Sequence, residues 1–207
     1  MSRRFESRSM LTLLIAGALG LGALLALPPT GQSKDFKAVV AEIKAASERF
    51  TDVNVALAEG YIRDPAGHCI TAEMEGQPVE KGVMGIHYFR PDMLGIKATE
   101  PRVDGTGTHT DFLNPSVLVY EPQADGSLEL VAVENLVFAK AWEAANDAPP
   151  SSYGLEWVAM IDNPETELDE AHGFEPHHEL HAWVFRENPN GPFEPINPNA
   201  TCEHHQH

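Results

Sequence analysis

The sequence predicts an α+β domain in which N-terminal helices pack on a mostly antiparallel β-sheet. Apolar residues recur every three or four positions over residues 35–50, which is the spacing of an amphipathic helix. From Gly82 onward the chain instead has short runs of β-branched and aromatic residues between turn signals, which is typical of strands. Asp125-Gly126 lies between two of these runs, and Asp-Gly favours a hairpin turn. The sequence leaves open whether the sheet closes into a barrel.

The helical region has two predicted parts. Thr51 is a suitable N-cap for a second, short helix, which Gly60 is expected to end. A third short helix is predicted over residues 139–146, before Pro149 and Pro150. The apolar face of the first helix consists of Phe36, Val39, Val40, Ile43 and Ala46.

The strand region contains apolar runs that are separated by glycine and proline. Residues 90–115 form a long irregular connection, because they contain six glycines and prolines and no sustained period. The predicted strands cover residues 82–89, 116–120, 128–138, 155–161 and 178–186.

The N-terminal residues have the three parts of an export signal. Three arginines precede an uncharged apolar run, Met10–Leu27, and two prolines end it. A run of 18 residues is also close to the length of a membrane span, so an uncleaved anchor or a buried core helix are the alternatives. We predict a signal peptide over residues 1–27, a linker over 28–34, a single α+β domain over 35–202 and a His-rich tail over 203–207.

The charge of the chain excludes two classes of partner. The formal net charge is −17, and residues 1–27 carry three Arg and one Glu, so the remainder carries −19. Such a surface repels nucleic acid and anionic lipid headgroups, although solvation alone also explains it. We expect a metal ion or a small molecule as the partner, with no membrane contact beyond an uncleaved anchor.

The two cysteines, Cys69 and Cys202, fit a periplasmic or secreted location. In an exported protein an even and minimal number of cysteines favours one disulfide. On the loop-entropy model, a disulfide that closes so long a loop contributes about 4–5 kcal/mol. The alternative is that Cys202 binds a metal ion beside Glu203, His204 and His205.

Histidine is concentrated near the C-terminus, where seven of ten lie in the last 36 positions. If residues 177–185 form a strand, Glu179 and His181 share a face and lie about 6.6–7 Å apart, so both can reach one ion. If they form a helix, His177 pairs with His181 at i, i+4. The aromatic and β-branched residues that follow favour the strand. Its two faces would carry His177, Glu179, His181, Trp183 and Phe185 on one side and His178, Leu180, Ala182 and Val184 on the core side.

Two further polar residues lie within apolar predicted strands. His87 is surrounded by apolar neighbours, and Glu134 has the same parity as Leu128, Leu130 and Ala132. An ionised carboxylate on an apolar face is costly unless it is paired or bound to a cation. Both residues are therefore candidate ligands.

These residues predict a transition-metal site. Two imidazoles and one carboxylate on adjacent strands suit Zn²⁺, Fe²⁺, Mn²⁺ or Cu²⁺. The predicted ligands are His87, Glu134 and His181, with Glu179 or His177 as auxiliary ligands. The structural alternative is a hydrogen-bonded core network without metal. The His-rich tail would bind transition metals weakly in either case.

Several segments of the chain form a recognisable set. They are GVMGIHY (82–88), LVYEP (118–122), LVAVE (130–134), ELHAWVF (179–185), NPNG (188–191) and the NPN segment that leads from Asn197 to Cys202. The set resembles a group of uncharacterised secreted or periplasmic bacterial proteins, and the similarity covers residues 45–202. It implies a shared architecture, a site at His87, Glu134 and His181, and a disulfide between Cys69 and Cys202, but no activity.

The resulting functional prediction is an exported soluble domain that binds a transition metal for metal handling or small-molecule binding. Two alternatives come from other classes: a metal-free secreted interaction domain, and a metal-dependent hydrolase or oxygenase. The sequence contains no nucleophile elbow, phosphate-binding glycine loop or haem-attachment motif. Whether the protein is an enzyme is left open.

Overall fold

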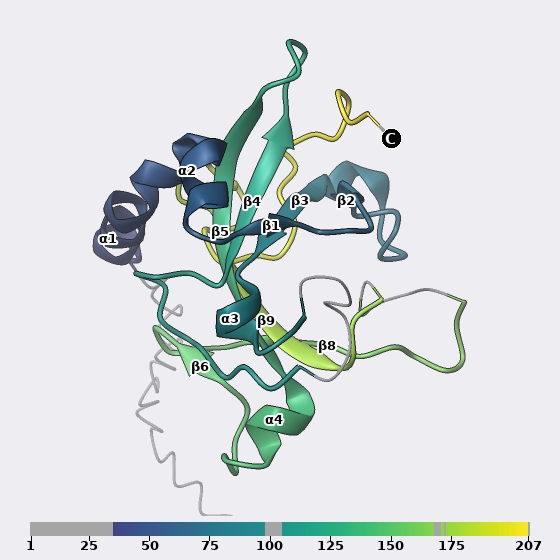
Figure 1. Ribbon diagram of the computed structural model, residues 1–207. Helices are drawn as coiled ribbons and strands as arrows, with labels where there is room; N and C mark the ends of the chain where they lie inside the picture. The colour runs from purple at the N-terminus through teal and green to yellow at the C-terminus, as the bar shows by residue number, and fades with distance from the viewer. Residues whose placement is uncertain (1–34, 98–104, 168–170, 172, 207) are drawn as a thin grey trace, which may run out of the picture. The chain divides into compact units, whose positions relative to one another are not determined.

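The computed structural model describes residues 35–97, 105–167, 171 and 173–206. They lie in a compact unit that begins at Asp35. The predicted signal peptide and linker lie outside the described residues. The predicted α+β class is confirmed, since a few helices accompany a mostly antiparallel sheet (Figure 1).

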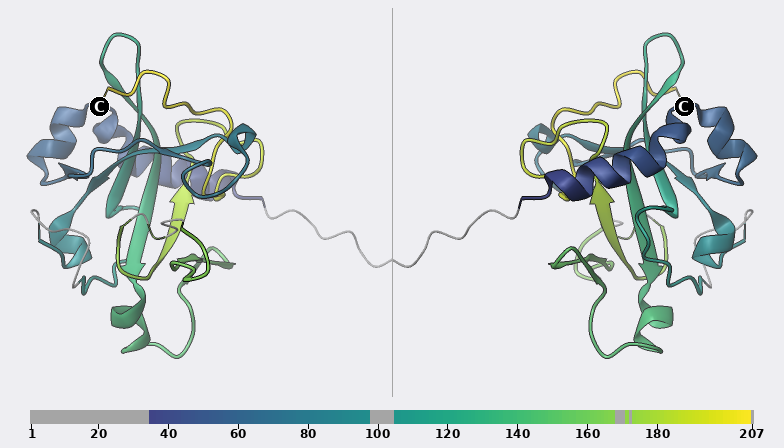
Figure 2. Two further views of the ribbon diagram at one scale, coloured as in Figure 1. Left: turned by 90° about the vertical axis from the view of Figure 1, so that its right-hand side faces the viewer. Right: turned by 90° about the vertical axis from the view of Figure 1, so that its left-hand side faces the viewer.

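Three helical segments begin the unit and cover one face of the sheet. Ile43, Phe50 and Ala56, one from each segment, are completely buried in the cluster that joins helices to sheet. Figure 2 shows the first helix running across the strands. The segments are α1 (Lys37–Ser47), the 3-10 helix η1 (Glu48–Thr51) and α2 (Val53–Ala58).

The N-cap of α2 differs from the prediction. Thr51 belongs to η1, where its hydroxyl donates to the Glu48 carbonyl at 2.8 Å. Asp52 caps α2 instead, because its carboxylate accepts a hydrogen bond from the Asn54 N–H at 2.9 Å. Gly60, with φ of 95°, follows the end of α2 as predicted.

Seven strands of the described residues form one sheet in the order β1-β3-β4-β5-β9-β8, with β2 paired to β3. All pairings are antiparallel, and β1 and β8 are edges, so these strands form an open sheet and not a barrel. The strands are β1 (Ile62–Arg63), β2 (Ile70–Thr71), β3 (Val83–Phe89), β4 (Val117–Pro122), β5 (Leu128–Phe138), β8 (Val158–Met160) and β9 (His177–Ala182). The smaller elements are η2 (Val79–Lys81), α3 (Pro91–Leu94), α4 (Ala139–Glu143) and the separate pair β6 (Ser151–Ser152) and β7 (Leu155–Glu156).

A β-bulge in β5 reverses the alternation of its side chains. Val119 of β4 pairs with Ala132, but the next residue, Tyr120, pairs with Leu130, so Val131 is extra. Leu130 therefore packs in the helix-covered cluster, whereas Ala132 packs on the opposite face. The predicted shared face of Glu134 with Leu130 and Leu128 is wrong for this reason. Glu134 faces the side of the sheet away from the helices.

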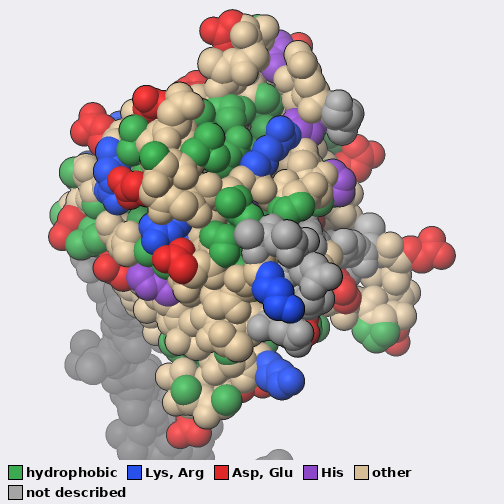
Figure 3. Space-filling view, viewed as in Figure 1, with side chains coloured by type: hydrophobic (Ala, Val, Ile, Leu, Met, Phe, Trp, Pro, Cys, Tyr) green, Lys and Arg blue, Asp and Glu red, His purple; other side chains and the backbone are tan. Residues whose placement is uncertain are grey.

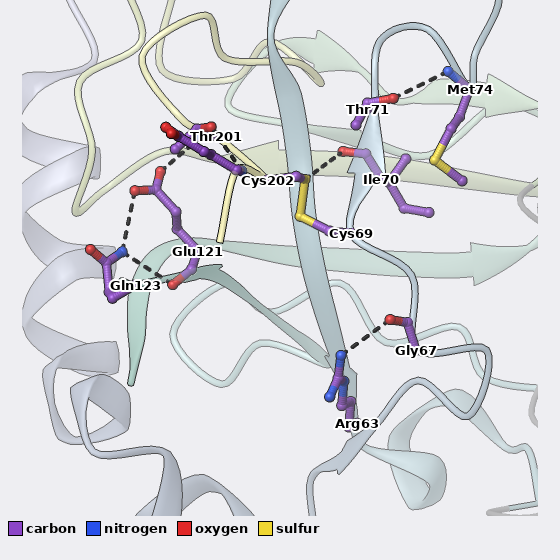
Figure 4. The surroundings of a disulfide bond; sticks show 11 residues. Arg63, Gly67, Cys69, Ile70, Thr71, Met74, Glu121, Gln123, Thr201 and Cys202 are labelled. Carbon is purple, nitrogen blue, oxygen red and sulfur yellow. Dashed lines mark hydrogen bonds between the residues drawn. A yellow bond between two sulfur atoms is a disulfide. The ribbon is translucent and has the colours of Figure 1, made fainter. Parts of the chain in front are cut away.

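The C-terminal segment is fastened to the sheet by the predicted disulfide, Cys69–Cys202, whose sequence separation is 133 residues (Figure 4). The buried carboxylate of Glu121 adds to this attachment. It accepts hydrogen bonds from the Thr201 N–H at 3.0 Å and from the Arg186 guanidinium at 3.1 Å. Cys202 is thus a disulfide partner and not a metal ligand.

The surface carries acidic side chains that are scattered among other residues (Figure 3). No single basic patch is visible on the face that this figure shows. Among the described residues, no helix has the length and apolar composition that a membrane crossing requires.

Candidate metal centre

Strand register brings His87, Glu134 and His181 together. Glu134 of β5 lies directly opposite His181 of β9. His87 lies on β3, and β4 runs between it and β5. On this face β4 presents Val117, the partner of Glu134, and Val119, the partner of His87. These short side chains leave room for the His87 and Glu134 side chains to meet above β4.

The three side chains converge on one point. The Nε2 atom of His87 lies 3.2 Å from Oε2 of Glu134, and Nε2 of His181 lies 3.4 Å from the same oxygen. One donor atom from each residue lies within 4.8 Å of the other two. The two imidazole rings are edge-on, with centroids 5.9 Å apart. Among the described residues, this is the group of three His, Cys or acidic side chains that could hold a metal ion.

These distances match the spacing of ligands around one ion. Zinc bonds to histidine nitrogen and carboxylate oxygen at about 2.0–2.2 Å, so two ligands of a tetrahedral zinc ion are about 3.3–3.6 Å apart. The separation of 3.2 Å between His87 and Glu134 lies just below this range, and that of 3.4 Å between His181 and Glu134 lies within it. Two imidazoles and one carboxylate also suit iron, manganese and copper, so the donor set fits a transition metal without selecting one.

Burial makes the absence of hydrogen bonds in this group informative. Glu134 is 1% exposed and His181 is 1% exposed. Within the described part of the chain, neither ring nitrogen of His181 forms a hydrogen bond, and neither does the Oε2 atom of Glu134. A buried carboxylate oxygen without a hydrogen bond is costly, and a bound cation removes that cost. The group could therefore hold a metal ion or form a hydrogen-bonded network.

Glu179 and His177, the predicted auxiliary ligands, lie behind His181 along β9. Oε1 of Glu179 lies 3.6 Å from Nδ1 of His181, the ring nitrogen that faces away from Glu134. Oε2 of Glu179 lies 3.6 Å from Nε2 of His177, and Nδ1 of His177 lies 3.0 Å from the Glu175 carbonyl oxygen. A carboxylate behind a ligand histidine orients the ring and raises its basicity. The structure thus places Glu179 next to the His181 ring and outside the three-residue group around Glu134.

A small pocket adjoins two of the three candidate ligands, His87 and Glu134. It has about 20 Å³ of space for a water-sized sphere, which is enough for one water molecule. Its polar lining includes His87 and Glu134 of the candidate site, together with Glu179 and His177. Its apolar lining is Ile70, Phe89, Leu136 and Phe174.

Asp64 also lines this pocket, and the sequence did not indicate it. Asp64 is only 5% exposed and follows β1 directly. In the sequence it begins an Asp-Pro-Ala-Gly stretch, which is typical of a turn, and its Oδ1 does accept a hydrogen bond from the Ala66 N–H. A turn residue gives no sequence signal of burial. Only the pairing of β1 with β3 reveals that Asp64 also lines this pocket.

The remaining histidines near the C-terminus lie apart from the site. His178 points to the other face of β9, as predicted, and burial lowers its pKa. His204 and His205 lie against a different pocket, which also includes Arg63 and Gln123. They do not belong to the three-residue group around Glu134.

No protein family, curated protein or solved structure matches this chain, so the candidate site is defined by its own geometry.

Proposed function

We propose that this protein is an exported domain that binds one transition-metal ion through His87, Glu134 and His181. The observation that carries the proposal is the convergence of three buried donor atoms within 4.8 Å, with no hydrogen bond from the described residues to Glu134 Oε2 or to the His181 ring nitrogens. The disulfide supports an oxidising location, periplasmic or secreted, because such bonds persist outside the cytosol. In that setting the protein would handle metal or bind a small molecule at the metal.

A second candidate function is metal-dependent chemistry. Three protein ligands leave at least one coordination position of a four-coordinate ion open, as catalytic sites do. The pocket beside His87 and Glu134 lies where a further ligand can reach the ion. Hydrolases and oxygenases both use such an open position, and the pocket favours this class over a purely structural metal.

Metal analysis of the protein without an affinity tag tests the proposal. We expect about one equivalent of a transition metal per chain, and a higher melting temperature when metal is added back to the metal-free protein. His87→Ala and His181→Ala should each lose the metal. Deletion of residues 203–207 is the matched control, because it removes two described histidines that lie outside the site.

The opposite result is equally clear. Less than about a tenth of an equivalent of every transition metal, with unchanged melting on addition of Zn²⁺ or Cu²⁺, would leave the metal-free interaction domain as the better account.

A further inference from the structure

Residues 192–202 of the C-terminal segment lie against the strand that carries the candidate ligand His87. Asn197 exchanges two backbone hydrogen bonds with Val83 at the start of β3, at 3.0 and 3.2 Å, and the two residues form an antiparallel bridge. His87 lies four residues further along the same strand. The C-terminal segment thus extends the sheet at the end of the strand that holds one imidazole of the site.

Trp183 connects the same segment to the second imidazole. Its indole ring stacks on the His181 ring, with the planes inclined by 14° and the centroids 6.2 Å apart. The backbone N–H of Trp183 donates to the Pro192 carbonyl at 2.8 Å, and the indole N–H donates to the Glu194 carbonyl at 2.6 Å. Stacking at this separation is attractive and restricts the orientation of the imidazole. A ligand ring that packing already holds in place loses less conformational freedom when it binds an ion.

The disulfide fastens two segments that lie beside the candidate metal centre. Cys202 packs against the apolar cluster that contains Trp183. Its partner Cys69 directly precedes Ile70, which lines the pocket of the centre and pairs with Gly85 of β3 (Figure 4). Breaking the S–S bond therefore releases, in one step, a segment next to each of the two imidazoles.

We propose that the Cys69–Cys202 disulfide sets the affinity of the metal site, with Trp183 as the positioning residue that connects Cys202 to His181. The oxidised protein binds the ion tightly. The reduced protein binds it weakly, because the C-terminal segment no longer holds the imidazole in place. Coupling between two sites is reciprocal, so bound metal favours the disulfide by the same factor. This inference rests on the metal site of the proposed function.

The two states interconvert by thiol–disulfide exchange with a dithiol. The S–S bond between Cys69 and Cys202 breaks, an S–S bond forms within the dithiol, and the two thiol hydrogens pass to the protein sulfurs. The dithiol is oxidised and the protein is reduced by two electrons. Cys69 is 5% exposed and Cys202 is more exposed, so attack falls on the Cys202 sulfur.

Zn²⁺ affinity, measured by competition with a chelating dye, tests the coupling. We expect the Cys69→Ser/Cys202→Ser double variant to bind Zn²⁺ about tenfold more weakly than the oxidised wild type, a factor typical of coupled sites. The double variant lacks thiols that could themselves bind the ion.

Variants of Trp183 test the connection with the disulfide intact. Trp183→Leu should weaken Zn²⁺ binding about tenfold, whereas Trp183→Phe should restore most of the affinity because it keeps a ring that can stack on His181. Trp157→Leu is the matched control and should keep the wild-type affinity. Trp157 is also 3% exposed, but it packs in the helix-covered cluster.

A redox titration of the wild type measures the same coupling from the other side. The reduced fraction is read from the mass shift on alkylation, in buffers of reduced and oxidised dithiothreitol with free Zn²⁺ fixed by a chelator. Saturating Zn²⁺ should lower the equilibrium constant for reduction about tenfold, the same factor by which the loss of the disulfide weakens binding.

Each contrary outcome overturns a different statement. Equal Zn²⁺ affinity in the oxidised wild type and a folded double variant refutes the coupling and leaves the metal site standing. Equal loss of affinity in Trp183→Leu and Trp157→Leu, or no loss in either, refutes the role of Trp183. Absence of Zn²⁺ binding in the oxidised wild type refutes the proposed function itself. If the double variant does not fold, the two tryptophan variants decide, because both keep the disulfide.

Discussion

Two buried glutamates of the sheet, Glu121 and Glu134, differ in the hydrogen bonds that their carboxylates accept. Glu121 is 5% exposed and accepts hydrogen bonds from Arg186 and from the Thr201 N–H. Glu134 is 1% exposed, and its Oε2 faces His87 and His181 but forms no hydrogen bond with any residue that the structure describes. Glu121 is therefore satisfied by hydrogen bonds within the protein, whereas Oε2 of Glu134 has no hydrogen-bond partner among the described residues.

The two glutamates should respond oppositely to replacement by glutamine in a chelating buffer. We expect Glu121→Gln to lower the free energy of unfolding by about 2 kcal/mol, because it weakens a partly buried ion pair with Arg186. Glu134→Gln should leave the free energy of unfolding unchanged or raise it, because it removes a buried charge that has no cation. Urea unfolding of the metal-free proteins measures both values.

Metal addition supplies the control for this comparison. Glu121→Gln should keep the stabilisation that metal brings, and Glu134→Gln should lose it. A metal-free Glu134→Gln protein that is destabilised as much as Glu121→Gln would indicate a hydrogen-bonded network at Glu134.

At the scale of elements, two tyrosines fasten distant segments to the sheet. The Tyr120 hydroxyl, on β4, donates to the Phe50 carbonyl of η1 at 2.7 Å. The Tyr61 hydroxyl, just before β1, donates to the Pro115 carbonyl. Both side chains are almost completely buried, and burial is the main cause that raises the pKa of each.

The raised tyrosine pKa values predict a loss of stability at alkaline pH. A phenol whose pKa is higher in the folded state contributes its full stability below the unfolded value of about 10. That contribution is lost as the pH rises from there through the higher folded pKa. Urea unfolding between about pH 8 and 11 should show a falling free energy of unfolding, with a smaller fall in Tyr120→Phe. An equal fall in Tyr120→Phe and the wild type would show that Tyr120 is not responsible.

At the scale of the whole unit, one covalent bond joins the segment before β2 to the C-terminal segment. Cys69 directly precedes β2, whose Ile70 lines the pocket of the candidate metal centre. The bridge spans a sequence separation of 133 residues. A cross-link over so long a loop removes much of the conformational entropy of the unfolded chain.

Replacement of both cysteines by serine should therefore lower the free energy of unfolding by about 4–5 kcal/mol on the loop-entropy model. Urea unfolding of the double variant and of the wild type with and without a thiol reductant measures the difference. Reduced wild type should match the variant. A loss below about 1 kcal/mol would show that the C-terminal segment is held by the Glu121 contacts and the packing around it instead.

Most of the fold could be predicted from local signals. The β5 strand has the predicted bounds, 128–138. In β9 and in Trp183, which follows it, the side chains alternate between the two faces of the sheet as predicted. The short strands β1 and β2 were not predicted, because two-residue strands have no period to detect. The prediction that Glu134 lies on the same face of the sheet as Leu130 was wrong. The single extra residue Val131 reverses the alternation of side chains in β5, and it leaves no mark in the sequence.

The sequence by itself determined the class of the fold, the disulfide partners and the residue types of the candidate site. Hydrophobic period, turn residues and an even cysteine count are local or compositional, so they can be read without coordinates. Only the tertiary structure decided which groups meet. Register places Glu134 opposite His181, brings His87 to both across β4 and adds Asp64 to the same pocket. Such contacts join residues that are far apart along the chain, and their geometry follows from strand pairing and one bulge.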